Sequence, residues 1–255
     1  MKFTDVLTAT DTNPLYYKFV PIFIKAWKKL FPDVNIHIIL ISHKMIPELE
    51  PYSEYIKLFH PIKNVSTAFI AQNIRLLYPC LLETQGGVLI TDMDIIPMNK
   101  NYYIEPIKKL DDDKFICYRQ LECVGKNEMV ICYNIAYPQT WRDIFSIKTI
   151  QDIIFTIEEI LYKNSEYVGH KHMPYWITDQ LYLYNCTLRW SKNHLGRLII
   201  LNDKLTNFKR LDRGRFPDNS TLINLIKVGY YSDYHMYRPY DQYKEVNDQI
   251  VDLLN

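Results

Sequence analysis

The first hundred residues change repeatedly between the hydrophobic spacing of strands and that of helices. Residues 2–10 (KFTDVLTAT) alternate with a period of two, which predicts a strand, and DTNP directly after them predicts a loop. Residues 36–42 (IHIILIS) form a continuous apolar run with the length of a buried strand. Residues 55–62 (YIKLFHPI) predict a third strand.

Two segments between these strands have apolar residues at helical spacing. Residues 15–31 predict a helix in which Pro21 lies in the first turns or causes a kink. Residues 66–87 predict a second helix that begins after Ser66 as N-cap and stops at Gly86. We expect the glycines that follow this helix to let the chain turn sharply back into the sheet.

This alternation of strands and helices predicts an α/β fold with a mainly parallel sheet covered by helices. Ligands of such sheets bind at the carboxyl ends of the strands. Residues 86–97 (GGVLITDMDIIP) contain a predicted strand that runs into Asp92 and Asp94. Both aspartates are therefore expected at the edge of the sheet where ligands bind.

The second half of the chain mixes shorter strands with longer helices. Two strands are predicted around an intervening turn, followed by one or two helices, a further helix, a strand and a C-terminal helix. The residue ranges are, in that order, 113–120, 128–137, 140–164, 176–190, 196–203 and 241–255. Because no linker rich in Gly, Ser or Pro, no repeat and no low-complexity tract interrupts residues 1–255, we expect a single domain.

Composition and charge exclude several classes of protein. The 255 residues carry a formal net charge of +1, which argues against a nucleic-acid-binding protein that relies on a basic face. The N-terminal residues lack the apolar core of a signal peptide, and no run is long enough to span a membrane, so we expect a soluble, cytoplasmic protein. The five cysteines contain no C-x-x-C pair, which favours buried thiols over disulfides or a zinc site.

Asp92 and Asp94 are the first candidate functional residues. An Asp-x-Asp tripeptide is commonly an exposed turn. If the strand continues through both residues, however, their side chains point to the same face within a few Å. Like charges at that separation repel each other unless a cation lies between them, and paired carboxylate oxygens favour Mn²⁺ or Mg²⁺. The sequence therefore predicts a metal site that binds a diphosphate.

Residues 68–97 (AFIAQNIRLLYPCLLETQGGVLITDMDIIP) resemble the segment of GT-A glycosyltransferases that combines an arginine-bearing helix, a Gly-Gly turn, an apolar strand and Asp-x-Asp. The chain is most similar to the small, single-domain members found in large DNA viruses and in bacterial surface-polysaccharide clusters. A viral member would act in the host cytoplasm. The resemblance implies a Rossmann-like GT-A domain with a smaller antiparallel portion on the acceptor side. Residues 1–98 would form the nucleotide-binding half and residues 99–255 the acceptor-binding half.

The resemblance also implies the metal ligands. Asp94 would contact Mn²⁺ or Mg²⁺, and Asp92 would contact the metal or the donor ribose. Residues 230–240 (YYSDYHMYRPY) are similar to the C-terminal segment that supplies a histidine ligand in this family, which makes His235 a candidate. Alternatively His235 is a surface residue. Arg238 is expected at the diphosphate because a planar guanidinium suits phosphate oxygens.

Residues 173–185 (MPYWITDQLYLYN) contain the candidate catalytic residue. Asp179 would take the proton from the acceptor hydroxyl in an inverting enzyme, and Gln180 would lie beneath the sugar in a retaining one. The alternative is that Asp179 merely caps a helix. Tyr175 and Trp176 would stack on sugar faces, or they belong to the core.

The remaining candidates would bind the donor or the sugar. The end of the first strand is expected to cradle base and ribose through Thr8, Ala9, Thr10 and Asp11. Arg75 would face the base or phosphate, or it is a solvated helix residue. Asn134 would bind sugar hydroxyls, or its side chain stabilises a loop. The basic run 208–216 (FKRLDRGRF) is solvated or guides an anionic donor.

These expectations combine into one function and two alternatives. The sequence predicts a metal-dependent enzyme that transfers a sugar from a nucleoside-diphosphate sugar, with UDP favoured over GDP, to a glycan, a glycoprotein or another hydroxyl acceptor. A nucleotidyltransferase that makes nucleotide sugars is disfavoured because residues 7–18 (LTATDTNPLYYK) lack a Gly-rich loop. A non-catalytic sugar-binding protein is the other alternative.

Overall fold

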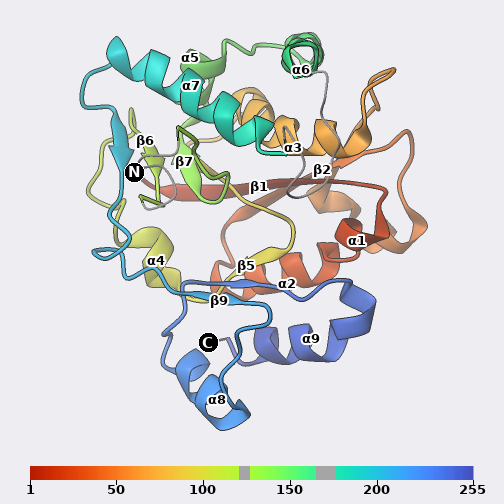
Figure 1. Ribbon diagram of the computed structural model, residues 1–255, viewed down its shortest axis with the longest axis vertical. Helices are drawn as coiled ribbons and strands as arrows, with labels where there is room; N and C mark the ends of the chain where they lie inside the picture. The colour runs from red at the N-terminus through yellow and green to blue at the C-terminus, as the bar shows by residue number, and fades with distance from the viewer. Residues whose placement is uncertain (121–126, 165–175, 255) are drawn as a thin grey trace.

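The computed structural model describes residues 1–120, 127–164 and 176–254. In this part of the chain, seven strands form a central sheet in the order β3-β2-β1-β4-β7-β6-β8, and three short strands form a second sheet in the order β5-β10-β9. Helices cover both faces of the central sheet, and the second sheet lies on one of these faces together with the C-terminal helices (Figure 1).

The strands β1 to β4 are longer than the six strands that follow them in the described chain. Their bounds are β1 Phe3–Asp11, β2 Asn35–Ile41, β3 Ile56–Phe59, β4 Gly87–Ile90, β5 Ile95–Pro97, β6 Phe115–Cys117, β7 Asn134–Ala136, β8 Leu198–Ile200, β9 Arg210–Asp212 and β10 Asp233–His235. Every strand predicted from the hydrophobic pattern is present. The strands β5, β9 and β10 were not predicted because, unlike the equally short β6, β7 and β8, they do not lie within a longer apolar run.

The α-helices are α1 Pro14–Tyr17, α2 Val20–Leu30, α3 Thr67–Leu77, α4 Lys100–Ile104, α5 Pro138–Phe145, α6 Ile150–Lys163, α7 Thr178–Lys192, α8 Asn219–Lys227 and α9 Lys244–Asp252. Three 3₁₀ helices, η1 Pro47–Tyr55, η2 Tyr78–Leu81 and η3 Tyr240–Tyr243, complete the helical segments of the described residues. Pro21 lies in the first turn of α2, where its missing N–H costs no hydrogen bond.

The strands β3, β2, β1 and β4 are parallel, which confirms the fold class predicted from the sequence. β7 is antiparallel to both β4 and β6, and β8 is parallel to β6. In the second sheet β10 is antiparallel to β5 and parallel to β9, so this sheet is mixed rather than purely antiparallel. The carboxyl ends of β1, β2, β3 and β4 all lie at one edge of the central sheet.

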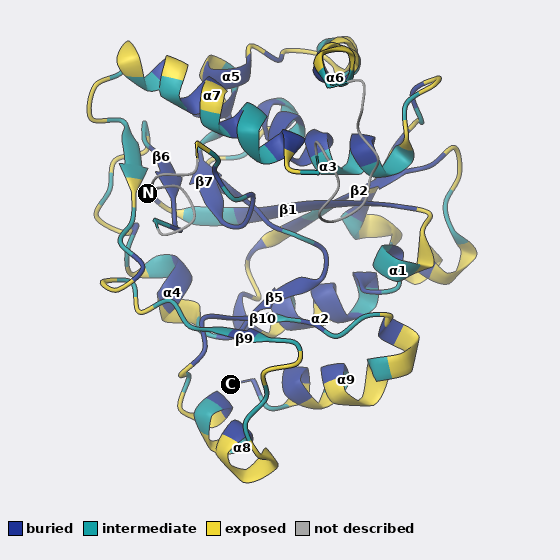
Figure 2. Cartoon of the chain, in the orientation of Figure 1, coloured by how far each residue is buried: buried dark blue, intermediate teal, exposed yellow. Residues whose placement is uncertain are grey.

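The side chains of the central strands alternate between two hydrophobic cores. Val6 and Ile38 belong to the core beneath α2, the second sheet and α9. Leu7 and Ile39 belong to the core formed with α3, α5, α6 and α7. Figure 2 shows the buried faces of these helices turned towards the sheet and their exposed faces turned outwards. Burial on both sides explains the continuous apolar run of β2.

The helix predicted over residues 66–87 ends earlier than expected. α3 stops at Leu77 and a 3₁₀ turn continues to Leu81, because Pro79 cannot donate the backbone hydrogen bond of a continuing helix. Gly86 does not serve as a left-handed helix stop. A Cβ atom at Gly86 would lie 2.1 Å from Thr4 Oγ1, so this glycine is needed for the close approach of β1.

Two further segments differ in detail from the prediction. Residues 140–164 form two helices, because Ser146 adopts a left-handed conformation with a φ of 59° that ends α5. Residues 128–133 are not part of a strand, so β7 is shorter than predicted. The described cysteines Cys80, Cys117, Cys132 and Cys186 are buried. Among the described residues, no helix has the length and apolar character needed to cross a bilayer.

A buried carboxylate stabilises the edge of the sheet opposite the ligand-binding edge. Asp5 on β1 accepts hydrogen bonds from Thr4 Oγ1 and Thr84 Oγ1 and from Asn35 Nδ2, and its Oδ1 lies 2.8 Å from His37 Nε2. Burial would raise the pKa of Asp5, but the hydrogen bonds from His37, Thr4 and Thr84 outweigh burial and lower it.

Replacing Asp5 by Asn should lower the free energy of unfolding by about 2 kcal/mol at pH 7, because the donors around the carboxylate lose a charged acceptor. The wild-type carboxylate contributes this stability above about pH 4 and loses it as the pH falls through its lowered folded-state pKa. Urea unfolding at pH 7 and pH 3 should therefore show a difference between the two proteins that shrinks at pH 3. The exposed Asp33→Asn is the control, and equal stability of Asp5→Asn and wild type at pH 7 would contradict the prediction.

Candidate donor and metal site

Charged side chains from both halves of the chain meet beyond the carboxyl end of β4. The strand ends at Ile90, and the chain turns through residues 91–94 before it enters β5. α3 supplies Arg75, the first turn of α7 supplies Asp179, and β10 supplies His235. These side chains form two charge clusters, one around Asp92 and one around Asp94.

The first cluster is centred on Arg75. Its guanidinium donates to Asp92 Oδ1 through Nη1 and to Asp179 Oδ2 through Nη2, the latter at 3.2 Å. The side chains of Arg75 and Asp179 are 9% and 5% exposed, whereas that of Asp92 is 35% exposed. Arg75 is therefore not a solvated helix residue, because it joins a buried carboxylate of α7 to the partly exposed one after β4.

Asp179 lies in an environment that disfavours its charge. Burial raises the pKa of Asp179 to about 6, although the charge of Arg75 opposes this rise. Its Oδ1 accepts a hydrogen bond from the backbone N–H of Gln180, so Asp179 also satisfies a donor of the first helical turn. A carboxyl group whose pKa lies near 6 is suited to exchange a proton close to neutral pH.

The second cluster surrounds Asp94. Its Oδ2 lies 3.3 Å from His235 Nε2, 3.3 Å from Arg213 Nη1 and 3.7 Å from Arg238 Nη1. Burial would raise the pKa of Asp94, but the neighbouring His235 and the guanidinium charges of Arg238 and Arg213 hold it well below its usual range. Asp94 is therefore a carboxylate at any pH near neutrality.

His235 is oriented by a second acid. Its Nδ1 lies 2.8 Å from Asp212 Oδ1, and its Nε2 faces both Asp94 and Arg213. β9 and β10 run parallel with Asp212 directly opposite His235, which fixes this pair through the register of the sheet. A carboxylate on Nδ1 leaves Nε2 free to bind a cation, as in histidine ligands of metal ions.

The two aspartates after β4 do not share one face. The condition under which they would share a face, a strand that continues through both, is not met, because β4 ends at Ile90 and Ile95 N donates to Asp92 O across a turn. Asp92 turns towards Arg75, and Asp94 turns towards His235. The two carboxylates consequently have different partners.

The cluster around Asp94 fits a divalent cation in part. Asp94 Oδ2 and His235 Nε2 are 3.3 Å apart, a separation that a single ion can span as two neighbouring ligands, and Asp212 orients the imidazole. Among the described residues, however, no group of three or more His, Cys, Asp or Glu side chains could hold a metal ion. A metal at this position would need phosphate oxygens or water as its remaining ligands, which is usual for Mg²⁺.

Solved structures resemble this chain over nearly its whole length. The galactosyltransferase LgtC, in a complex with donor and acceptor sugar analogues, matches with a TM-score of 0.52 and 14% identity over 99% of this chain and 96% of LgtC. The glycosyltransferase GlyE of Streptococcus pneumoniae TIGR4 matches with a TM-score of 0.50 and 15% identity over 98% of this chain and 60% of GlyE. The chain has the GT-A fold. No family model matches its sequence, and no curated protein does.

The GT-A fold places the predicted donor residues at the end of β1. Thr8, Thr10 and Asp11 are buried, and Ala9 is 8% exposed. Asp11 accepts hydrogen bonds from Asn13 N and Thr67 Oγ1, which tie the end of β1 to α3. Their contact with a nucleoside stays a prediction.

Arg238 and Asn134 both donate hydrogen bonds within the protein. Arg238 donates to Tyr16 Oη at 2.8 Å and so lies between α1 and Asp94. The Asn134 amide donates to the carbonyls of Val130 and Ile131, as expected for the alternative in which it stabilises a loop. Its Oδ1 is buried and has no hydrogen-bond partner among the described residues.

The predicted acceptor residues lie next to a gap in the described chain. Tyr175 lies outside the described residues, and Trp176 is half-buried two residues before the start of α7. Gln180 is half-buried in the first turn of α7, and its carbonyl accepts a hydrogen bond from Met129 N. A sugar-binding role for these residues stays a prediction.

Sequence reasoning did not assign Arg213 and Asp212 to the site, and it missed Cys132. Cys132 Sγ lies 3.5 Å from Asp92 Oδ2 and 3.7 Å from Arg210 Nη2. The basic run 208–216 was noticed, but its residues have separate roles, because Arg210 pairs with the fully buried Asp233. Only the strand pairing of β9 with β10 shows which of these side chains reaches Asp94.

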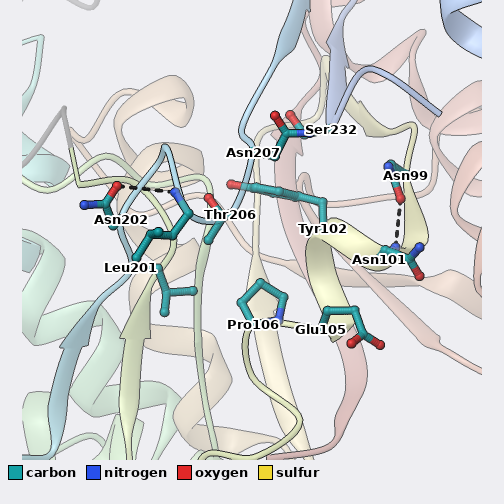
Figure 3. Close-up of a pocket in the computed structure, with 11 residues that line it drawn as sticks. Asn99, Asn101, Tyr102, Glu105, Pro106, Leu201, Asn202, Thr206, Asn207 and Ser232 are labelled. Carbon is teal, nitrogen blue, oxygen red and sulfur yellow. Dashed lines mark hydrogen bonds between the residues drawn. The ribbon is translucent and has the colours of Figure 1, made fainter.

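A cavity of about 490 Å³ lies apart from these clusters, between α4 and the segment after β8. Figure 3 shows Tyr102 at its centre, with Asn99 and Asn101 on one side and Asn202 and Thr206 on the other. None of the predicted site residues lines this cavity. It is therefore separate from the charged site of the GT-A fold.

Replacing Arg75 by Met should lower the free energy of unfolding by about 3 kcal/mol at pH 8, because Asp179 then remains buried without its cation. Without the Arg75 charge, the folded-state pKa of Asp179 rises further above its unfolded value. The folded variant therefore binds more protons than the unfolded chain, and its loss of stability shrinks as the pH falls to 5.

Chemical denaturation at the two pH values measures this difference. The exposed Arg189→Met on α7 is the matched control and should stay near wild-type stability at both pH values. If Arg75→Met lowers the free energy of unfolding equally at pH 8 and pH 5, Asp179 does not become an unpaired buried acid in that variant.

Proposed function

We propose that the chain is a metal-dependent glycosyltransferase that transfers a sugar from a nucleoside-diphosphate sugar to a hydroxyl group of a glycan or glycoprotein. One observation carries this proposal. In a GT-A fold, the carboxylate of Asp94 and the imidazole of His235 converge beyond the carboxyl end of β4 and are surrounded by arginines. The similarity to LgtC, a galactosyltransferase captured with donor and acceptor sugar analogues, supports the same function.

The proposed reaction breaks the bond between the anomeric carbon and the diphosphate of the donor. Negative charge develops on the departing diphosphate, and Mn²⁺ or Mg²⁺ would stabilise that charge as a Lewis acid. Asp94 and His235 would hold the ion, while Asp212 keeps His235 Nε2 directed towards it. Arg238, which Tyr16 holds near Asp94, would bind the diphosphate oxygens directly.

The donor nucleoside would lie along the end of β1, against residues 8–11. Asp92 is the more exposed of the two aspartates, and its Oδ2 is not engaged by Arg75. We therefore assign Asp92 to the donor ribose and Asp94 to the metal. UDP is the favoured nucleotide, as the family resemblance implies.

Asp179 is the proposed acceptor-facing residue. Its raised pKa suits a general base, and Arg75 fixes its orientation relative to Asp92. In a retaining reaction the neighbouring Gln180 would take the position beneath the sugar. The pH dependence of transfer separates these two assignments.

A nucleotidyltransferase is less well supported by the chain. β1 ends at Asp11 and α1 begins at Pro14, so the connection between them is too short and has the wrong composition for a Gly-rich phosphate loop. A non-catalytic sugar-binding protein would keep the fold without needing the buried charges around Asp94.

The first test is incubation of the full chain with a panel of UDP- and GDP-sugars and Mn²⁺, with release of nucleoside diphosphate as the readout. Wild type should release nucleotide from at least one donor. Asp94→Asn should lower the rate by at least about 100-fold, because the metal loses its charged ligand.

The control Asp33→Asn, which changes an exposed aspartate, should keep wild-type activity. Thermal melting of each variant separates loss of activity from loss of the fold. Pyrophosphate release from a nucleoside triphosphate and a sugar phosphate would instead identify a nucleotidyltransferase. Full activity of a folded Asp94→Asn would remove Asp94 from the mechanism.

For Asp179, kcat/KM should rise about tenfold per pH unit up to about pH 6 and level off above it, because only the deprotonated carboxylate accepts a proton. Asp179→Asn should lower kcat by about 100-fold or more while the affinity for UDP changes by less than about threefold. The exposed Asp143→Asn on α5 is the control. A loss of kcat below about tenfold, with the wild-type pH profile retained, would transfer the role to Gln180.

A further inference from the structure

Arg213 occupies the position between the two proposed metal ligands. Its Nη1 lies 3.3 Å from Asp94 Oδ2, and its Nη2 donates to His235 Nε2. Its Nη1 also donates to Met236 O at 2.9 Å, which holds the guanidinium in this orientation. The same oxygen and the same nitrogen would bind the divalent cation. Arg213 and a metal ion therefore compete for one pair of atoms.

We propose that Arg213 is a built-in cation that closes the metal position until donor and metal bind together. This inference rests on the proposed function of the site. In the chain alone, Arg213 neutralises the buried Asp94. A divalent ion that enters without a nucleotide must displace the Arg213 guanidinium from Asp94. No other anion is then present to pair with that guanidinium. The diphosphate of the donor supplies that anion, so it should make metal binding easier.

Arg213 stays at the metal position in the absence of a metal because the buried charge of Asp94 needs a cation. The Asp94 side chain is 9% exposed, and a buried carboxylate without a cation strongly destabilises a folded protein. Arg238 only partly replaces Arg213, since it lies farther from Asp94 and donates to Tyr16. A metal ion would neutralise Asp94 equally well, but it would need the position between Asp94 Oδ2 and His235 Nε2 that the Arg213 guanidinium fills. Either the metal or Arg213 is bound at a given time.

The local backbone allows Arg213 to leave without unfolding the sheet. Arg213 follows the last residue of β9, and Gly214 after it has a φ of +77° and open space around its Cβ position. The side chain of Arg213 is 22% exposed, so a path to solvent exists. Arg210 on the same strand contrasts with it, because Arg210 is anchored to the fully buried Asp233 at 2.6 Å. The strand can stay in place while Arg213 moves.

The consequence is a coupling between metal and nucleotide. Mn²⁺ alone should bind weakly to wild type, because it competes with Arg213. Mn²⁺ in the presence of UDP should bind much more tightly, because the displaced guanidinium then contacts phosphate oxygens. By linkage, Mn²⁺ raises the affinity for UDP by the same factor. Removing the Arg213 charge removes both the competitor and part of the coupling.

The experiment measures Mn²⁺ binding by the electron paramagnetic resonance signal of free Mn²⁺, with and without saturating UDP. The proteins are the full-length wild type, Arg213→Gln and the control Arg215→Gln, which changes an exposed arginine of the same turn. Without UDP, Arg213→Gln should bind Mn²⁺ about tenfold more tightly than wild type. With UDP this advantage should shrink, and Arg215→Gln should match wild type in both conditions.

Three results would overturn the inference. Equal or weaker Mn²⁺ binding by Arg213→Gln without UDP would show that Arg213 does not compete with the metal. An unchanged enhancement by UDP in that variant would show that Arg213 does not couple the two ligands. Absence of Mn²⁺ binding to wild type, with UDP present, would remove the metal from the site. If Arg213→Gln does not fold, Arg213→Lys serves instead, because one ammonium cannot bridge both atoms as the guanidinium does.

Failure of the proposed function gives a different pattern. If Mn²⁺ binding follows the expectation but no nucleotide sugar is turned over, the coupling by Arg213 stands and the transferase activity does not. If sugar transfer proceeds without any metal, the activity stands and Arg213 is a permanent cation of the site, which contradicts the inference.

Discussion

The buried carboxylate of Asp94 is the constraint on which the arrangement around the site depends. Burial disfavours its charge, so the fold must bring cations to it. The second sheet does this: β10 pairs antiparallel with β5 directly after Asp94, and β9 pairs parallel with β10. Met236 N also donates to Asp94 O, which joins the two segments through the backbone. His235, Arg213 and Arg238 thereby reach a residue more than a hundred positions earlier in the chain.

The two acids after β4 have been separated into two electrostatic environments. Asp94 is surrounded by cations, which keep it ionised, whereas Arg75 is shared between the two carboxylates of Asp92 and Asp179. Burial raises the pKa of Asp179, although the charge of Arg75 opposes this rise. Environments that move the pKa values of neighbouring acids apart allow one to bind a cation while another exchanges protons. This division agrees with the roles proposed for Asp94 and Asp179.

Much of the fold follows from hydrophobic spacing, because long buried strands and amphipathic helices leave clear periods. The strands β1 and β2 and the helices α2, α3 and α7 were predicted in this way. The predicted end of α3 at Gly86 is wrong, because Pro79 ends the helix and Gly86 instead allows close packing against Thr4. The short strands β9 and β10 lie outside any longer apolar run, and their pairing forms only with partners that are distant in sequence.

The sequence by itself determined that Asp92 and Asp94 follow a buried parallel strand and therefore lie at its ligand-binding edge. It also supplied His235 and Arg238 as candidates, through their resemblance to a known C-terminal segment. Only the tertiary structure decided that Arg75 links Asp92 to Asp179 and that Arg213 lies between Asp94 and His235. The reason is that these ion pairs join residues about a hundred positions apart. They form when the chain packs, and the loss of solvent that comes with packing strengthens them. Neither effect leaves a local pattern in the sequence.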